Sequence, residues 1–269
     1  MGNYFDGKVA LVTGGAAGLG RGLCEALARE GAHVIVSARS LANAEAVVAE
    51  LGADTSSALA LDVIDPDAVA AAIEHAVEHH GRIDFVFNNA GIAVAGQVQD
   101  VTPEMFKKVI DVNLLGAAYV TQAAYAQMID QGSGHIVNIG SMYGLVPGAL
   151  QSAYVAAKHG LTGLTLSLAA EAGHHGVDVS LICPGYIETS LFSSGTYESG
   201  FDADSAKAAI PFKLIDIEPA VDKIMAGVRR RQLIVAYPGY VRWGWRLTRL
   251  SQVLFRFYNS WQFRKTLPR

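Results

Sequence analysis

Cysteine is scarce in this sequence, and long apolar runs are absent. The 269 residues include two cysteines, Cys24 and Cys183, each within an apolar segment, which argues against a disulfide framework and a cysteine metal site. No uncharged apolar run reaches the ~18 residues that a membrane-spanning helix needs. The first residues also lack the charged-then-apolar build of a signal peptide. We therefore expect a cytoplasmic protein with one globular domain over residues 1–238.

Acidic residues are absent from the last part of the chain. Positions 240–269 hold seven Lys or Arg and no Asp or Glu, whereas the whole chain has a formal net charge of −4, so the rest carries −11. This balance does not indicate a nucleic-acid partner. It marks residues 239–269, called here the C-terminal extension, as a basic segment that needs its own explanation.

Short aliphatic runs alternate with longer helical patterns along the chain. This alternation predicts an α/β fold, a doubly wound parallel sheet of Rossmann type with about seven strands and helices on both faces. Ligands of such sheets bind beyond the carboxyl ends of the strands. The expected strands are residues 9–13, 33–37, 57–61, 85–87, 135–139, 179–183 and 233–236, and the helical patterns cover 20–30, 41–51, 66–80, 103–130 and 153–173.

A glycine-rich turn follows the first expected strand and opens the first helix. Such a turn lets backbone N–H groups approach a pyrophosphate, and the helix N-terminus adds a favourable partial charge. The alternative is an ordinary glycine turn, but its place between the first strand and helix favours nucleotide binding. The expected contacts are Gly14, Ala16, Ala17, Gly18, Leu19 and Gly20.

The end of the second strand indicates which nucleotide is bound. NAD-selective sites place a carboxylate here for the ribose 2′-hydroxyl, whereas this chain has Ala38 followed by Arg39. A guanidinium can hold a 2′-phosphate, so we expect NADP(H) to be preferred over NAD(H). The alternative is that Arg39 is a solvated loop cation. After the third strand, Asp62 and Val63 either lie near the adenine or, in the case of Asp62, cap the helix that starts at Pro66.

Ser141, Tyr154 and Lys158 form the strongest chemical pattern. Tyr154 and Lys158 are four residues apart, on one face of a helix. A free phenol has a pKa of ~10, and a nearby ammonium is expected to lower the pKa of Tyr154. Ser141 follows the fifth strand and can donate to a substrate oxygen, and Asn113 could hold Lys158 through a water. The alternative is that Tyr154 and Lys158 are an ordinary pair on the surface of a helix. It is disfavoured, because the strand, the serine and the helix follow one another in the order that the chemistry needs.

These motifs resemble those of the short-chain dehydrogenase/reductase family, in its small single-domain branch. The similarity covers residues 7–236. It implies a glycine motif on Thr13, Gly14, Gly18 and Gly20, an Asn-Asn-Ala-Gly motif at Asn88, Asn89, Ala90 and Gly91, and a tetrad of Asn113, Ser141, Tyr154 and Lys158. It also implies cofactor contacts from Pro184, Gly185, Ile187 and Thr189. The basic residue found in the first loop of some NADP-users is missing, because Ala17 stands there.

The resemblance implies hydride transfer between NADP(H) and a small carbonyl compound or secondary alcohol. Tyr154 would be the general acid/base, Ser141 would polarise the substrate oxygen, and Lys158 would contact the ribose. Tyr143 and Tyr186 either line the substrate pocket or are packed aromatics. Residues 191–213 are expected to form an irregular lid, whose Phe192, Tyr197 and Phe201 favour a lipophilic substrate. A non-catalytic, cofactor-sensing protein is the alternative function, and a sugar-nucleotide epimerase or dehydratase is disfavoured.

The C-terminal extension carries an apolar stripe with arginines beside it. Trp243, Leu247, Leu250, Leu254, Phe257 and Trp261 recur at alternating four- and three-residue steps, which predicts one amphipathic helix, and Arg242, Arg246, Arg249 and Arg256 run alongside. Two interpretations stay open. One is peripheral contact with an anionic membrane surface, and the other is packing on the body or on a partner subunit.

Two further expectations concern assembly and metals. The helix at residues 153–173 has small and apolar residues on more than its core face, and in the resembling family this helix packs against its symmetry mate. We therefore expect a homo-oligomer, a tetramer or a dimer. His75 and His79 are spaced to chelate a metal, but no cysteine or carboxylate completes a site, so no metal is expected.

Overall fold

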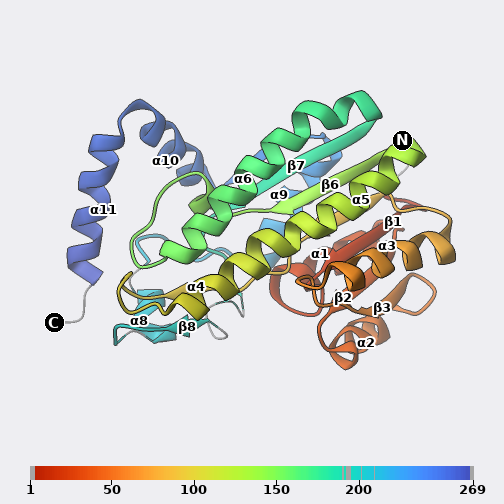
Figure 1. Ribbon diagram of the computed structural model, residues 1–269, viewed down its shortest axis with the longest axis horizontal. Helices are drawn as coiled ribbons and strands as arrows, with labels where there is room; N and C mark the ends of the chain where they lie inside the picture. The colour runs from red at the N-terminus through yellow and green to blue at the C-terminus, as the bar shows by residue number, and fades with distance from the viewer. Residues whose placement is uncertain (1–3, 190, 192–194, 201, 209, 267–269) are drawn as a thin grey trace.

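A seven-stranded parallel sheet is the centre of the protein (Figure 1). The computed structural model describes residues 4–189, 191, 195–200, 202–208 and 210–266. The strand order is β3-β2-β1-β4-β6-β7-β9, and each neighbouring pair is parallel. The strands are β1 (Val9–Thr13), β2 (His33–Ala38), β3 (Ser56–Ala60), β4 (Phe85–Asn88), β6 (Gly134–Ile139), β7 (Val177–Pro184) and β9 (Ile234–Tyr237). The predicted doubly wound fold is confirmed.

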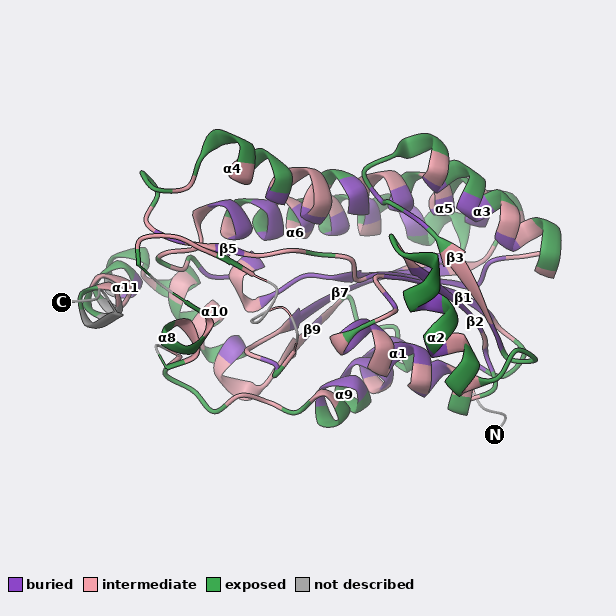
Figure 2. Ribbon diagram, turned by 90° about the horizontal axis from the view of Figure 1, so that it is seen from below, coloured by how far each residue is buried: buried purple, intermediate pink, exposed green. Residues whose placement is uncertain are grey.

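Helices cover both faces of this sheet (Figure 2). One layer contains α3 (Pro66–His80), α5 (Ala117–Gln131) and α6 (Ser152–Ala172), and the other contains α1 (Gly18–Arg29), α2 (Leu41–Leu51) and α9 (Ile217–Arg229). The carboxylate of Asp65 caps α3 by accepting from the N–H groups of Asp67 and Ala68. The alternative that Asp62 caps α3 is therefore wrong, and Asp62 accepts from Ile64 instead.

The two faces of the sheet bury separate apolar clusters, because successive strand side chains point to opposite faces. Val12, Val34 and Val36 pack toward α1 and α9, where Leu27 and Val228 are fully buried. Leu11 and Ile35 pack toward α3 and α5 on the other face. Burial on both faces explains why these strands read as continuous apolar runs in the sequence.

The helix predicted over residues 103–130 is interrupted. It consists of α4 (Pro103–Ile110), a single π-helical turn η1 (Asp111–Gly116) and α5. Asn113 lies in that turn and is 1% exposed. Its Oδ1 accepts from the N–H of Ile92 and its Nδ2 donates to the carbonyl of Ile92, at 2.8 Å each. A π-turn inserts an extra residue into the helical ladder and is frequent at functional sites, and here it turns Asn113 toward the segment after β4.

Residues 191–213, predicted to be an irregular lid, contain regular structure in their described part. β8 (Thr196–Tyr197) pairs with β5 (Val94–Ala95) in a small second sheet, and α8 (Ala203–Ala208) follows. Lys207 forms an ion pair with Glu188. The expectation of a wholly irregular loop is therefore wrong. Phe192 and Phe201 lie outside the described residues.

The C-terminal extension folds as two helices, α10 (Gly239–Leu250) and α11 (Gln252–Thr266). The prediction of one continuous helix is wrong, because Ser251 is extended, with φ −155° and ψ 100°. Val241 and Phe255 are buried in a cluster with Leu145 and Val146, which fixes both helices to the body. Within the described residues, no helix combines the length and the apolarity needed to cross a bilayer.

Candidate active site

The turn between β1 and α1 has the shape that a pyrophosphate requires. Gly14 and Gly18 have φ of +63° and +52°, a region that residues with a Cβ disfavour. A Cβ on Gly20 would collide with the carbonyl oxygen of Gly14 and the side-chain amide of Asn89. α1 starts at this turn, and its N-cap Ala17 makes no side-chain hydrogen bond, so the first N–H groups of the helix remain for an anion.

Thr13 joins this turn to the segment after β4. Its hydroxyl accepts from the N–H groups of Asn89 and Ala90, at 3.0 Å each, and donates to the carbonyl of Phe87. The Asn89 amide donates back to the carbonyls of Thr13 and Gly14, at 3.0 and 3.1 Å. The Asn-Asn-Ala-Gly segment is therefore held directly against the glycine turn, a contact between residues 76 positions apart in the chain.

Arg39 and Asp62 lie at the carboxyl edge of the sheet, on the side where β2 and β3 neighbour β1. Each follows a strand end, β2 for Arg39 and β3 for Asp62, and both are exposed. In the part of the chain that the structure describes, none of the ion pairs involves Arg39. Val63 is buried against Gly116, and its predicted contact with the cofactor stays a prediction. The residues fit a dinucleotide: two glycines with positive φ, a helix start without a side-chain cap, and a cation beyond β2.

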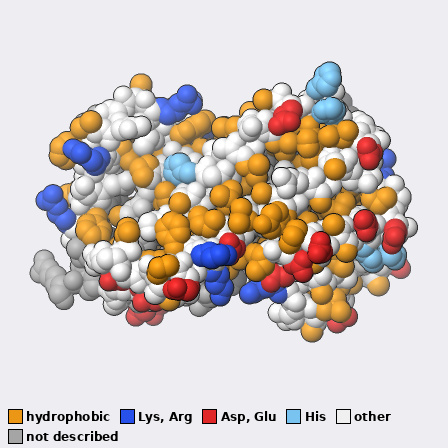
Figure 3. All heavy atoms as spheres, in the orientation of Figure 1, with side chains coloured by type: hydrophobic (Ala, Val, Ile, Leu, Met, Phe, Trp, Pro, Cys, Tyr) orange, Lys and Arg blue, Asp and Glu red, His pale blue; other side chains and the backbone are white. Residues whose placement is uncertain are grey.

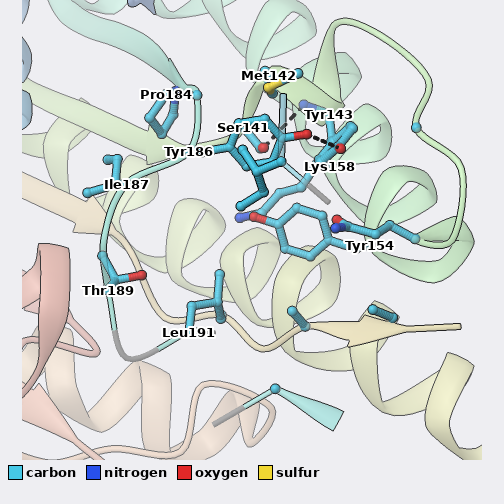
Figure 4. Close-up of a pocket in the computed structure, with 18 of the residues that line it drawn as sticks. Ser141, Met142, Tyr143, Tyr154, Lys158, Pro184, Tyr186, Ile187, Thr189 and Leu191 are labelled. Carbon is cyan, nitrogen blue, oxygen red and sulfur yellow. Dashed lines mark hydrogen bonds between the residues drawn. The ribbon is translucent and has the colours of Figure 1, made fainter. Parts of the chain in front are cut away.

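Ser141, Tyr154 and Lys158, all three buried, line one cavity (Figure 4). Ser141 follows β6 and caps the short 3₁₀ helix η2 (Met142–Gly144), where its Oγ accepts from the N–H of Tyr143 at 3.1 Å. Tyr154 and Lys158 lie on α6, 9% and 4% exposed. The ammonium of Lys158 donates to the carbonyl of Ile139 at 2.7 Å and lies 5.6 Å from the centre of the Tyr154 ring.

Burial dominates the protonation of this pair. It raises the pKa of Tyr154 to about 12, although a hydrogen bond with Ser141 acts in the opposite direction. It also lowers the pKa of Lys158 to about 8. The expectation that Lys158 lowers the pKa of Tyr154 is therefore not met in the protein alone. The reason is that removing the phenolate from water costs more free energy than its hydrogen bond with Ser141 restores.

Asn113 does not reach Lys158 with its side chain. Both polar atoms of its amide are bonded to Ile92, and a Cβ on Gly91 would press on its Oδ1. Its position therefore orders residues 91–93, which form part of the cavity wall near Tyr154. The predicted water-mediated contact with Lys158 stays a prediction.

The candidate site residues separate into two groups. Most of them line the cavity that contains Tyr154, from the glycine turn to the turn after β7. The lining includes Gly14, Ala17, Gly18, Leu19, Asn89, Ala90, Gly91, Ser141, Tyr143, Tyr154, Lys158, Pro184, Gly185, Tyr186, Ile187 and Thr189. Ala16, Gly20, Arg39, Asp62, Val63 and Asn113 are not part of that lining.

An aromatic column lines part of the cavity. The hydroxyls of Tyr143 and Tyr186 are 2.7 Å apart, and the Tyr143 ring stands at 89° to the ring of Tyr154. Phe212 stacks between Tyr186 and Tyr240, and the Tyr240 hydroxyl accepts the N–H of Tyr186. Figure 4 shows Tyr143, Tyr154 and Tyr186 reaching into the same space. Tyr143 and Tyr186 are thus packed aromatic residues that also line the cavity.

The cavity is large and almost free of charge. Its volume is about 400 Å³, and Lys158 is the one ionisable cation or carboxylate side chain among the described lining residues. Phe255, Asn259 and Phe263 of α11 also line it, and Asn259 donates to the carbonyl of Pro147 at 3.0 Å. Sequence reasoning missed these three residues, because the predicted stripe placed a different face of the extension inward.

His75 and His79 lie far from this cavity, on α3. Their rings are 3.9 Å apart, and the Nδ1 of His79 lies 2.9 Å from the carbonyl oxygen of His75. Over the described residues, no three His, Cys, Asp or Glu side chains gather closely enough to hold a metal ion.

This fold and this cavity define a nucleotide-binding oxidoreductase, and comparisons with known proteins agree. A family model described as short chain dehydrogenase matches residues 8–198. The chain is 34% identical to D-beta-hydroxybutyrate dehydrogenase of Cupriavidus necator, over 82% of this chain and 85% of that protein. It is 38% identical to cyclohexanol dehydrogenase of an Acinetobacter species, over 72% and 78%. The chain belongs to the short-chain dehydrogenase family.

A solved structure extends the similarity to nearly the whole chain. A short-chain dehydrogenase from Streptomyces avermitilis superposes with a TM-score of 0.81 at 28% identity, over 97% of this chain and 98% of that one. A match of that length includes most of the C-terminal extension, which the family model does not reach. The protein is thus an oxidoreductase of a family that uses NAD(P) cofactors and small-molecule substrates.

Lys158 makes the stability of the protein depend on pH. Its pKa in the folded protein, about 8, is below that of the unfolded chain, so the unfolded chain binds more protons between these values and stability rises with pH. The stabilisation from Tyr154 is fully present below pH ~10, so it does not change in this window. Between pH 8 and pH 10, the unfolding free energy of wild type should rise by about 2 kcal/mol more than that of Lys158→Met, as measured by urea denaturation. An equal pH dependence in both proteins would contradict a buried, readily deprotonated Lys158.

Proposed function

We propose that this protein transfers a hydride between NADP(H) and a neutral, lipophilic carbonyl compound or secondary alcohol, with Tyr154 as general acid/base. One observation carries the proposal. Ser141, Tyr154 and Lys158 line the same cavity as the glycine turn that fits a dinucleotide. A nicotinamide cofactor supplies the hydride or accepts it, and the remaining chemistry belongs to side chains of this chain.

Each of these side chains has a separate task. In reduction Tyr154 donates its proton to the nascent alkoxide, and a pKa raised to about 12 keeps that proton in place at neutral pH. Ser141 hydrogen-bonds the substrate oxygen and orients it. Lys158 holds the cofactor ribose and brings positive charge near the phenol. Asn113 is a positioning residue, since it orders the backbone of Ile92 beside the site.

The cavity favours a neutral substrate. Tyr143, Tyr186, Phe212, Phe255 and Phe263 supply aromatic surface, and no arginine or histidine is available in the described lining to hold a carboxylate. Among the described lining residues, Lys158 is the one cation, and it is assigned above to the cofactor ribose, so the chain's similarity to a D-beta-hydroxybutyrate dehydrogenase is not taken to include its acid substrate. A panel of ketones and alcohols with NADPH or NADP⁺ tests this. Cyclohexanone and longer neutral ketones should react faster than 3-oxobutyrate, and the reverse order would refute the proposal.

Arg39 is proposed to select NADP(H) over NAD(H). It is exposed beyond β2, and Ala38 stands where an NAD-selective site has a carboxylate. Exchanging both residues, as Ala38→Asp with Arg39→Leu, should weaken NADPH binding by about 10- to 100-fold, the equivalent of ~1.5–3 kcal/mol for a charge-assisted bond. NADH binding should improve. Titration of both cofactors against both proteins measures this, and a wild type that already prefers NADH would contradict the assignment.

We also propose that the enzyme is a cytoplasmic homo-oligomer, a dimer or a tetramer. Support comes from the outer face of α6 and its neighbour η1, where Leu166 and Leu115 are 38% and 37% exposed. A Cβ on Gly163 would meet no atom within 4 Å, so a second helix could approach closely there. Two buried cysteines fit a reducing compartment.

A further inference from the structure

The outer surface of the C-terminal extension is the most apolar part of the described exterior. Its exposed large hydrophobic side chains are Trp243, Leu247, Leu250, Val253, Phe257 and Trp261, and Leu250 and Trp243 are 84% and 70% exposed. Elsewhere in the described chain, such residues occur singly on different elements, such as Leu41 on α2 and Leu233 before β9. On each of the two helices these residues recur at three- or four-residue steps, so each helix presents an exposed apolar stripe, and an exposed apolar surface of this kind marks an interaction site.

Arginines are interleaved with these apolar side chains. Arg246 lies over the ring of Trp243, Arg249 over that of Trp245, and Arg256 over that of Phe257, each at 5.6 to 5.8 Å. The extension contains no Asp or Glu. Figure 3 shows Lys and Arg side chains among hydrophobic ones over α10 and α11, while the acidic side chains of that view lie below and to the right.

The opposite side of the same helices packs on the body, and in α11 it lines the cavity. Val241 and Phe255 are buried against the body, and Phe255, Asn259 and Phe263 line the cavity that contains Tyr154. The stripe predicted from the sequence is thus not what attaches the extension to the body, because its described members are exposed. One helix, α11, separates the substrate cavity from the outer apolar surface.

We propose that this outer surface docks on an anionic lipid bilayer, with its aromatic and aliphatic side chains in the interface and its arginines at the lipid phosphates. Amphipathic helices with this composition lie in the plane of a membrane, and each basic residue near an anionic surface contributes to binding. Docking would place the cavity one helix away from the lipid phase. A neutral, lipophilic substrate accumulates in that phase, and this part of the inference rests on the function proposed above.

A second copy of the chain is a poorer occupant. If two extensions packed on each other around a twofold axis, their exposed arginines would be brought together with no acidic residue of the extension to balance them. A head-to-tail contact would need a matching apolar patch on the body, and the exposed pair Leu115 and Leu166 belongs to the face proposed above for a different subunit contact. A bilayer satisfies both the apolar and the charge requirement at once.

The test is co-sedimentation of the full-length protein with vesicles, without cofactor or substrate, so that it does not depend on catalysis. Vesicles of phosphatidylcholine with phosphatidylglycerol should bind the protein, and pure phosphatidylcholine should bind it at least tenfold more weakly. Leu250→Ser with Phe257→Ser should weaken binding at least tenfold, because each buried apolar side chain contributes strongly. Arg246→Gln, Arg249→Gln and Arg256→Gln together should weaken it by tens to about a hundredfold, and added salt should also weaken binding.

Matched controls separate docking from general surface effects. Leu233→Ser with Val98→Ser removes two exposed apolar residues outside the extension, which are 42% and 69% exposed, and it should leave vesicle binding unchanged. Unaltered mass by light scattering and unaltered cofactor binding would show that the variants are folded. Failure of wild type to sediment with anionic vesicles would overturn the proposal. So would a Leu250→Ser, Phe257→Ser variant that changes the oligomer mass and binds vesicles as wild type does.

Discussion

Replacing Tyr154 by Phe should abolish most of the activity while leaving the protein folded. The ring is retained and only the hydroxyl is lost, so the packing of the buried side chain on α6 is preserved. Positioned general acids contribute ~10²–10⁴-fold to rates, and kcat should fall by at least that range. Cofactor affinity should stay within a few-fold, because the glycine turn and Arg39 are untouched. Steady-state kinetics and a cofactor titration on the same samples measure both quantities.

Tyr125 offers the matched control for this substitution. Its hydroxyl is buried on α5, far from the cavity, and has no hydrogen-bond partner in the described part of the protein. Tyr125→Phe should therefore keep wild-type turnover. Turnover near that of wild type in Tyr154→Phe would remove Tyr154 from the mechanism.

Gly20→Ala should abolish most of the cofactor binding, because the new side chain would push the glycine turn out of its present shape. The new Cβ would meet the carbonyl of Gly14 and the amide of Asn89, both fixed by the hydrogen bonds around Thr13. Because neither group is the free end of a flexible side chain, the turn itself must shift. Overpacking of this kind costs ~1–3 kcal/mol, and a displaced turn also loses its fit to the pyrophosphate. We expect at least a hundredfold loss in NADPH affinity by fluorescence titration.

Gly22 lies on the same helix and separates stability from binding. A Cβ there would meet the ends of the Ile217 and Val221 side chains on α9, at 2.7 and 3.0 Å. Gly22→Ala should lower the melting temperature, because it strains the α1–α9 contact, yet keep NADPH affinity. If both variants lost affinity equally, the loss would reflect helix packing and not the cofactor turn.

Much of the sheet and of the site could be predicted because local patterns and global fold agree. β1, α2 and α3 have the predicted bounds, since continuous apolar runs and a proline at a helix start are strong local signals. The grouping of Ser141, Tyr154 and Lys158 followed from their places after β6 and on one face of α6. The rule that ligands bind at the carboxyl ends of parallel strands located the cavity.

What the sequence did not predict depends on contacts between distant segments. The π-turn at Asn113 exists because its amide bonds to Ile92, 21 positions away. The pairing of β8 with β5 joins residues about a hundred positions apart. Local patterns do not show such a pairing, so residues 191–213 were predicted to be irregular. The extension was assigned one helix by its periodicity, but the chain breaks at Ser251, and Phe255, which lies outside the predicted stripe, is buried against the body. The raised pKa of Tyr154 likewise reflects burial that spacing alone does not show.

Transfer of deuterium from the cofactor to the substrate tests the central claim most directly. NADPH deuterated at the transferable position of the nicotinamide would be incubated with the best neutral ketone of the panel, and the alcohol would be analysed by mass spectrometry. We predict deuterium at the carbinol carbon with wild type and Tyr125→Phe, and at least a hundredfold less product with Tyr154→Phe. An alcohol without deuterium, or equal labelling with Tyr154→Phe, would contradict hydride transfer governed by Tyr154.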